Sequence, residues 1–255
     1  MNLTHYLDSK LANFNVSRYD ILYIYSDLRE LGKYKPVSES KQEFLQQIIK
    51  VLLKNVSTVI TPTFTYTTSG IFEVQRTPTR LGALNAQFLQ DSSVERSEHP
   101  VFSYASIGVH SHLIKNIGKS AFGIDSIFER LLSKKAAFLY IGRPVRLGNT
   151  MIHFVEQLNN ADYRFEKIFE TKVYDDGKFI GDDYRAFVRK RDNLENAYEF
   201  SFEKATEVLV QKKLIRQIWI TNEFSNLSLL PYSEVFEELN SLIKKDISIF
   251  LKQPL

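Results

Sequence analysis

The chain contains no cysteine among its 255 residues. Disulfide bonds, thiolate nucleophiles and zinc sites built on cysteine are therefore excluded. Met1 to His5 lack the basic start and apolar run of a signal peptide. No apolar run approaches the roughly 18 residues that a membrane-spanning helix needs. We therefore expect a cytoplasmic protein that has no membrane partner.

An excess of either charge is also missing. The 33 Lys and Arg residues exceed the 30 Asp and Glu residues by only three. Dedicated nucleic-acid binders cluster many more basic residues on one face, so we expect no nucleic-acid partner. A mildly basic chain suits anionic small molecules better than polycations. Glycine-rich phosphate loops are absent too, because neither a Walker A sequence nor a Rossmann glycine pattern occurs.

What the chain does contain is typical of a soluble globular protein, with 44% hydrophobic and 25% charged residues. Aromatic residues make up 13%, and nearly all of them are Phe or Tyr. Such residues form either an aromatic core or flat-walled pockets. We expect the core.

Local signals along the first third of the chain predict a βαβ unit. Residues 20–25 read as a short buried strand, and 56–60 read as a second strand that ends at a proline. Between them, Ser40 and Glu43 form a capping box that opens an amphipathic helix. Strand, helix and strand in this order predict a largely parallel sheet.

Later segments extend this α/β pattern. We expect a buried strand over 136–141, a helix with Thr150 at its N-cap, a hairpin within 169–180 around Asp176-Gly177, and a solvated, charge-rich stretch over 182–196. Further helices are predicted over 202–213 and 235–250, with a strand at 218–220 between them. The expected fold is α/β, with a mainly parallel central sheet flanked by helices and a β-hairpin excursion. Residues 1–255 should form one domain, with the excursion at about 162–200.

His153 and Glu156 are the first candidates for chemistry. They stand three positions apart, so they are neighbours on one face of a helix. A carboxylate beside an imidazole fixes its tautomer and stabilises the imidazolium that forms after proton abstraction. From the spacing alone, a plain surface ion pair explains the two residues better than a catalytic pair does.

The other histidines give weaker signals. His110 and His112 offer two metal ligands, but no third ligand follows nearby, so we expect no metal site. Ser97-Glu98-His99 is a cluster of reactive side chains, yet the adjacent Pro100 indicates a turn and favours a structural histidine.

Several motifs taken together resemble the aminoglycoside 3-N-acetyltransferase family, also called the antibiotic N-acetyltransferase family. That family carries a Thr-Arg-x-Gly element and then an Arg-Ser-x-His-Pro element with a serine shortly after it. Here these stand as Thr79-Arg80, Gly82, Arg96-Ser97, His99-Pro100 and Ser103. ILYIYSDLRELG and TPTFTY precede them, and Phe122-Gly123, Ser126, FLYIG and Asn149-Thr150 follow in family order up to His153 and Glu156. The similarity runs from about Ile21 to Glu156.

The resemblance implies an acyltransferase that uses acetyl-CoA or another acyl-CoA and no metal. Carried across residue by residue, His153 is the catalytic base and Glu156 orients it. The coenzyme and acyl site would be lined by Ser26, Thr79, Arg80, Ser97, Ser103 and Thr150. We expect the tetrahedral oxyanion to meet backbone N–H groups or the Thr79 hydroxyl. Arg80 or Arg96 could meet a coenzyme phosphate, although a buried structural arginine is equally consistent with the sequence.

Departures from the family pattern bear on the acceptor. The usual His-Ser-Ser is Tyr25-Ser26-Asp27 here, Leu147-Gly148 replaces a polar pair, and the short insert 66–78 contains Glu73 as its only acid. A polycationic aminoglycoside calls for several carboxylates. We therefore expect an anionic acceptor, namely a nucleotide-linked amino sugar.

Acceptor contacts are expected from Tyr25, Asp27, Tyr66 and Arg146, with further phosphate contacts from Arg143 or from Arg189-Lys190-Arg191. The alternative function is aminoglycoside 3-N-acetylation, as in antibiotic resistance. The alternative of another class is a binding protein that keeps the fold without catalysis. A homodimer is compatible with each of these functions.

Overall fold

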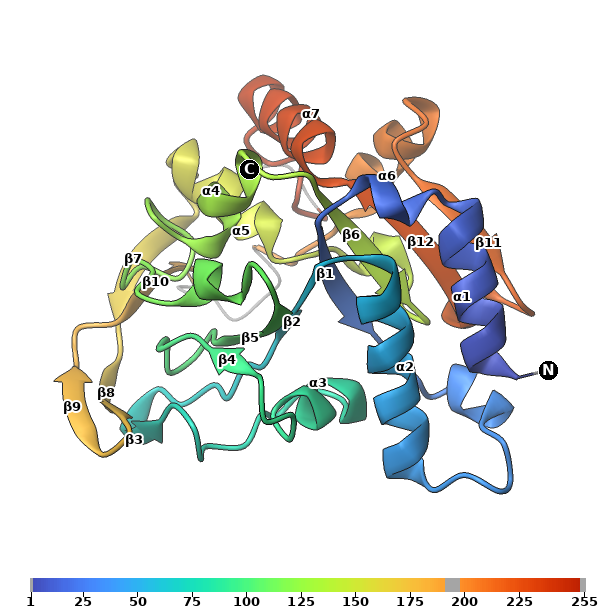
Figure 1. Ribbon diagram of the computed structural model, residues 1–255. Coiled ribbons are helices and arrows are strands. Elements are labelled where there is room, and N and C mark those ends of the chain that lie inside the picture. The colour runs from blue at the N-terminus through green and yellow to red at the C-terminus, as the bar shows by residue number, and fades with distance from the viewer. Residues whose placement is uncertain (1, 191–197, 253–255) are drawn as a thin grey trace.

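A seven-stranded sheet runs through the centre of the molecule (Figure 1). The computed structural model describes residues 2–190 and 198–252. In spatial order the strands are β11 (Arg216–Trp219), β12 (Asn226–Pro231), β6 (Ala136–Ile141), β1 (Ile21–Ser26), β2 (Thr58–Pro62), β5 (Tyr104–Gly108) and β4 (Glu95–Arg96). The central strands β6, β1 and β2 are parallel, and the strands outside them pair antiparallel. The α/β prediction is confirmed, and its parallel part is the centre of a mixed sheet.

Helices cover both faces of this sheet (Figure 1). One face packs against α1 (Leu3–Asn13), α2 (Lys41–Asn55) and α3 (Ala83–Phe88), and the other packs against α4 (Ile127–Leu132), α5 (Met151–Leu158), α6 (Glu203–Gln211) and α7 (Tyr232–Lys245). Successive residues of β1 point to opposite faces, so Tyr23 joins one cluster while Leu22 and Ile24 join the other. Because both clusters share one sheet, we propose that the chain forms a single domain.

The predicted capping box begins α2. The Glu43 N–H donates to Ser40 Oγ over 3.1 Å, and the Ser40 N–H donates to Glu43 Oε2 over 2.8 Å. These two bonds satisfy N–H groups that the first helical turn leaves without partners. The strand predicted over 136–141 is confirmed as β6.

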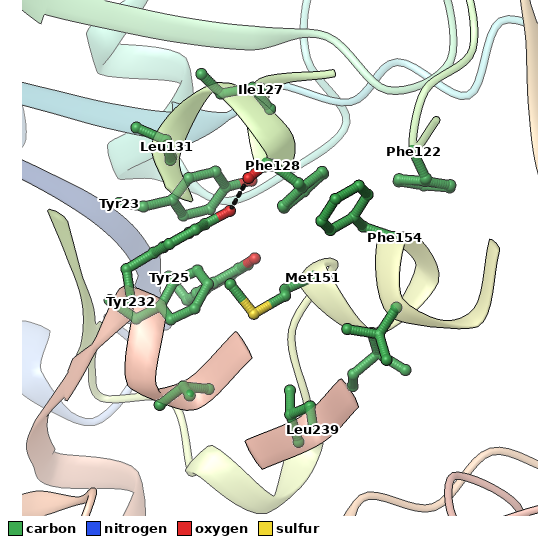
Figure 2. Packing of buried hydrophobic residues seen from close by; sticks show 14 of the residues in the cluster. Tyr23, Tyr25, Phe122, Ile127, Phe128, Leu131, Met151, Phe154, Tyr232 and Leu239 are labelled. Atoms are coloured by element: carbon green, nitrogen blue, oxygen red, sulfur yellow. Dashed lines mark hydrogen bonds between the residues drawn. The ribbon is translucent and has the colours of Figure 1, made fainter. Parts of the chain in front are cut away.

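The core beside α4, α5 and α7 is strongly aromatic, as predicted. Tyr23, Phe128, Phe138 and Tyr232 are fully buried there, and the ring centroids of Phe138 and Tyr232 lie 4.8 Å apart. Figure 2 shows Tyr232 reaching from α7 to the backbone of α4, where its hydroxyl donates to the Phe128 carbonyl over 2.9 Å. A buried tyrosine needs such a partner for its polar end.

Two small sheets lie beside the central one (Figure 1). The first contains β3 (Ser69–Glu73), β8 (Glu170–Asp175) and β9 (Lys178–Gly181), and the second pairs β7 (Arg164–Ile168) with β10 (Arg185–Arg189). The predicted hairpin is confirmed as β8 and β9. Asp176 and Gly177 both adopt positive φ, 49° and 75°, at its turn, as this type of hairpin requires.

Two sequence predictions need correction. Within the stretch expected to be solvated, residues 185–189 form β10, and Ala186 is buried because it packs into the main core. The last helix ends at Lys245 instead of continuing to Phe250, since Asp246 leaves helical geometry with φ −144° and ψ 103°. Among the described residues, no helix is both long and apolar enough to cross a membrane.

Candidate active site

A cavity of about 380 Å³ opens where the parallel strands end. Its walls include Tyr25 and Ser26 from the end of β1, Phe64 and Tyr66 from the chain after β2, and Thr150 and His153 from the chain after β6. In α/β sheets, ligands bind outside the carboxyl ends of the strands, because loops from neighbouring strands converge there.

Gly142 brings the chain after β6 close to the chain after β1. It has a φ of +70°, and a Cβ at this position would lie only 2.0 Å from the Asp27 carbonyl oxygen. Only glycine fits such an approach. Tight packing at this point lets the segment after β6 carry Thr150 and His153 back over the end of β1.

Thr150 stands at the N-cap of α5, as predicted, but its hydroxyl has a different partner. The Thr150 side chain makes no hydrogen bond to the backbone N–H groups at the start of α5. Instead, Thr150 Oγ1 lies 2.6 Å from the Tyr25 hydroxyl, and the Thr150 N–H donates to that hydroxyl over 3.1 Å. Burial raises the pKa of Tyr25, which therefore stays protonated at neutral pH.

One edge of the His153 ring faces the cavity, and the other edge faces Glu156. The His153 Nδ1 lies 2.9 Å from Glu156 Oε2 and 3.0 Å from Arg164 Nη2. Because the ionised carboxylate only accepts, we assign the imidazole proton to Nδ1, which donates to Glu156 and leaves Nε2 with its lone pair. The His153 side chain is 26% exposed, whereas that of Glu156 is 1% exposed. The alternative of a plain surface ion pair is wrong, because the carboxylate is enclosed by protein.

Tyr163 and Arg164 complete the surroundings of Glu156. The Tyr163 hydroxyl donates to Glu156 Oε1 over 2.8 Å, and Arg164 Nη2 lies 2.7 Å from Glu156 Oε2. Arg164 also donates from Nη1 to the Phe187 carbonyl over 2.9 Å, which ties β7 to β10. Sequence reasoning missed both residues, since neither stands at a spacing that signals contact with Glu156.

Burial and charge set the protonation states of this group. Burial raises the pKa of Glu156, but the hydrogen bond from His153 and the charge of Arg164 outweigh it and leave the pKa below its usual range. For His153, burial and the Arg164 charge lower the pKa, while Glu156 raises it less. The imidazole is therefore neutral at pH 7 and able to accept a proton.

Ser97 and Ser103 were expected at the coenzyme site, but both are fully buried. Ser97 Oγ accepts from the Tyr104 N–H over 2.9 Å, and Ser103 Oγ donates to the Thr63 carbonyl over 2.8 Å. These hydroxyls hold protein backbone and do not line the cavity.

Thr79, Arg80 and Arg96 also lie outside the cavity lining. Thr79 Oγ1 donates to the Phe64 carbonyl over 2.9 Å, and Arg80 is exposed. Arg96 is buried, and its guanidinium donates to backbone carbonyls, including that of Thr63 over 3.1 Å. Burial lowers the pKa of Arg96 to about 10. Arg96 is therefore the structural arginine that the sequence allowed as an alternative.

A second cavity of about 580 Å³ adjoins the first. Both are lined by Ser26 and Gly82, and the second also contains Asp27. Its basic side chains are Arg29, Lys35 and Lys41. Arg146, expected to contact the acceptor, lines neither cavity and pairs with Glu223, with Nε 3.0 Å from Oε2.

The remaining histidine candidates give no metal centre. The rings of His110 and His112 lie 6.2 Å apart, and the described part of the chain brings no third His, Cys, Asp or Glu to them to form a metal cluster. His99 is buried, and its burial lowers its pKa to about 4. Its Nε2 lies 3.0 Å from the Arg185 carbonyl, which gives it a structural position.

Comparisons with known proteins agree with this architecture. Solved structures with the same fold include the aminoglycoside acetyltransferase AAC(3)-IVa as apoenzyme, with a TM-score of 0.76 and 20% identity over 98% of this chain and 92% of that one. AAC-IIIb, in a binary complex with CoASH, has a TM-score of 0.76 and 15% identity, and the match covers 99% of this chain and 98% of that one. The YokD protein from Bacillus subtilis has a TM-score of 0.69 and 14% identity, and the match covers 92% of this chain and 93% of that one.

Sequence comparison identifies the family. No curated protein sequence matches the chain significantly. A family model described as aminoglycoside 3-N-acetyltransferase, however, matches residues 24–243, which is most of the chain. The protein is therefore an acyltransferase that belongs to the aminoglycoside 3-N-acetyltransferase family.

Proposed function

We propose that the protein transfers an acetyl group from acetyl-CoA to a primary amine of a small amino-sugar compound. The observation that carries this proposal is His153, which faces the cavity while its Nδ1 is held 2.9 Å from a buried carboxylate. A neutral imidazole in that position can take a proton from an attacking amine, an effect that typically contributes about 10²–10⁴-fold in rate.

The reaction needs no covalent intermediate on the protein. His153 Nε2 accepts the proton of the amine as its nitrogen attacks the thioester carbonyl. The C–N bond forms, the tetrahedral oxyanion collapses, and the C–S bond breaks. The proton then passes from the imidazolium to the departing thiolate. Because the Thr79 hydroxyl is bonded to the Phe64 carbonyl, we expect the oxyanion to meet backbone N–H groups or a hydroxyl of the cavity lining such as that of Ser26.

The second cavity suits the coenzyme. It is lined by the cations Lys41, Lys35 and Arg29, the last of which pairs with Asp27 of the same lining. Such groups suit phosphate oxygens. Ser26 and Gly82 connect it to the cavity that contains His153, so a pantetheine arm could reach the base. The similar fold of AAC-IIIb, solved with CoASH, supports a coenzyme A site in this architecture.

Two acceptor classes are supported by different observations. The comparisons favour an aminoglycoside, because the family is described by that activity and the similar AAC-VIa is solved with sisomicin. The cavity favours a nucleotide-linked amino sugar. Its charged lining is Arg143 and Arg189, and within the described ranges it contains no carboxylate to pair with a polycation. Of the basic run that was expected to bind phosphate, Arg191 lies outside the described residues.

One experiment tests both parts of the proposal. Thiol release from acetyl-CoA is measured in one buffer with a panel of aminoglycosides and a panel of nucleotide-linked amino sugars. Thiol release that depends on acceptor is expected, and its absence with every amine would contradict the function. An advantage of tenfold or more in kcat/KM for either panel identifies the acceptor class.

A further inference from the structure

A third cavity, of about 470 Å³, lies beside the His153 cavity, and Arg189 lines both. Its apolar lining includes Phe165 and Val188 on the paired strands β7 and β10, together with Phe102 and Phe169. Phe102 also lies close to the reaction centre. Its ring is 4.9 Å from that of Phe122, which is in turn 4.9 Å from the ring of His153.

The walls of this third cavity are fixed by the buried histidine His99. Its Nδ1 accepts from the Val101 and Phe102 N–H groups over 3.2 and 3.1 Å, and its Nε2 lies 3.0 Å from the Arg185 carbonyl at the start of β10. One imidazole therefore joins the loop that carries Phe102 to the strand that carries Val188. A site held this way is formed before ligand binds, which lowers the entropic cost of binding.

Lys167 brings a positive charge to the third cavity. Arg189 also lines it, and its Nη1 donates to the Tyr198 carbonyl over 2.6 Å; among the described residues no acid lines this cavity. The nearest acid along β7 is Glu166, which points to the opposite face, as alternation along a strand requires. Glu166 Oε1 accepts from Ser120 Oγ over 3.2 Å and is 3.4 Å from Arg185 Nε. Its charge is thus directed away from Lys167.

We propose that this third cavity is a subsite for the nucleoside diphosphate part of the acceptor. The base lies against the aromatic wall that includes Phe165 and Phe102, and the diphosphate meets Lys167 on its way to the sugar beside His153. Phosphate oxygens suit a cation. Stacking of a base on an aromatic ring stabilises binding and depends little on which base is bound. This inference rests on the proposed N-acetyl transfer and names its acceptor class.

A long acyl chain of the coenzyme is the competing occupant of an apolar cavity. The charge of Lys167 disfavours this occupant, because an acyl chain bound beside the ammonium group would remove it from water. The position also speaks against it. The proposed coenzyme cavity adjoins the His153 cavity at Ser26 and Gly82, whereas the third cavity adjoins it at Arg189.

The test uses UDP and dTDP as probes in calorimetric titrations of the full-length protein saturated with CoA, so that the coenzyme cavity is already filled. Binding to the wild type is expected. Phe165→Ala should weaken it about fivefold or more through lost stacking, and Lys167→Ala should weaken it in low salt more than in high salt. The controls Phe179→Ala and Lys178→Ala alter residues of β9 that are similarly exposed and line no described cavity, and they should bind as the wild type does.

Kinetics give a second readout. With a nucleotide-linked amino sugar, Phe165→Ala should raise KM with kcat unchanged, and with the free amino sugar it should change neither. No UDP or dTDP binding by the CoA-saturated protein, or equal binding by Phe165→Ala and Phe179→Ala, would overturn the subsite. So would a change in acyl-chain selectivity caused by Phe165→Ala. Rapid acetylation of aminoglycosides without nucleotide binding refutes the subsite alone, whereas failure to acetylate any amine refutes the proposed function.

Discussion

Arg164 and Glu156 form a buried ion pair in which the guanidinium Nη2 lies 2.7 Å from carboxylate Oε2, the oxygen that also accepts from His153. Their side chains are 3% and 1% exposed. One carboxylate oxygen is thus shared by a permanent cation and by a titrating imidazole. Glu156 favours the imidazolium, and Arg164 opposes it, so the two residues adjust the basicity of His153 in opposite directions.

We expect His153→Gln to lower kcat by about 10²–10⁴-fold, because glutamine cannot accept a proton from the attacking amine. The melting temperature and CoA affinity should remain near those of the wild type, since the side chain is at the cavity wall. Thiol release, thermal unfolding and CoA titration provide the three measurements. A variant that keeps more than about a tenth of wild-type kcat would exclude His153 as the base.

Glu156→Gln should move the acidic limb of the kcat/KM profile to lower pH. The base works as the neutral imidazole, so activity falls as the pH drops through its pKa. Removing the carboxylate charge destabilises the imidazolium and lowers that pKa further. Tyr163→Phe, which keeps the carboxylate, should shift the limb less. An unshifted limb in Glu156→Gln would contradict the orienting and electrostatic role of Glu156.

Arg164→Gln should move the same limb in the opposite direction, to higher pH. Loss of the cation leaves the Glu156 charge free to stabilise the imidazolium, which raises the pKa of His153. Arg164→Lys keeps the charge and should stay close to the wild-type profile. A limb that moves to lower pH in Arg164→Gln would show that Glu156 becomes protonated without its partner, contrary to this prediction.

The same Arg164→Gln substitution should destabilise the fold. Removing one partner of a buried ion pair typically costs about 3–5 kcal/mol, because the other charge remains buried without compensation. Urea unfolding of this variant and of Arg164→Lys at neutral pH measures the difference. Equal free energies of unfolding for wild type and Arg164→Gln would indicate that water replaces the guanidinium.

CoA alone should raise the melting temperature, since a ligand that binds only the native state stabilises it. Lys41→Ala should weaken this effect, because Lys41 lines the proposed coenzyme cavity. Lys50→Ala, on the same helix α2 but outside that cavity, is the matched control. The same CoA-induced shift in both variants would place the phosphates elsewhere.

Activity should not change with EDTA or with added Mg²⁺ or Zn²⁺. The reaction that we propose needs only a base and a thioester, and His110 and His112 lack a third ligand among the described residues. Thiol release with and without chelator is the measurement. Loss of activity on chelation that Zn²⁺ restores would assign a metal role to these two histidines.

The family motifs allowed much of the fold and part of the site to be predicted. β6 and the α2 capping box follow from local sequence, because burial and N-terminal capping are decided within a few residues. The predicted proximity of His153 and Glu156 is equally local, since residues three apart on a helix are neighbours. The aromatic core was also evident in the composition.

Tertiary structure alone decided the rest. Tyr163 and Arg164 contact Glu156 because the chain folds back into β7 after α5, and no spacing in the sequence encodes that return. Ser97, Ser103 and Arg96 match family motifs, yet their polar groups bind backbone inside the protein. They lie in β4 or in the connection from β4 to β5, where they join these strands to neighbouring segments. The sequence by itself therefore determined the local elements and the His153–Glu156 pair. Which charges surround that pair depends on how the chain returns from α5 into β7, and which side chains line the cavities depends on contacts between segments far apart in the chain.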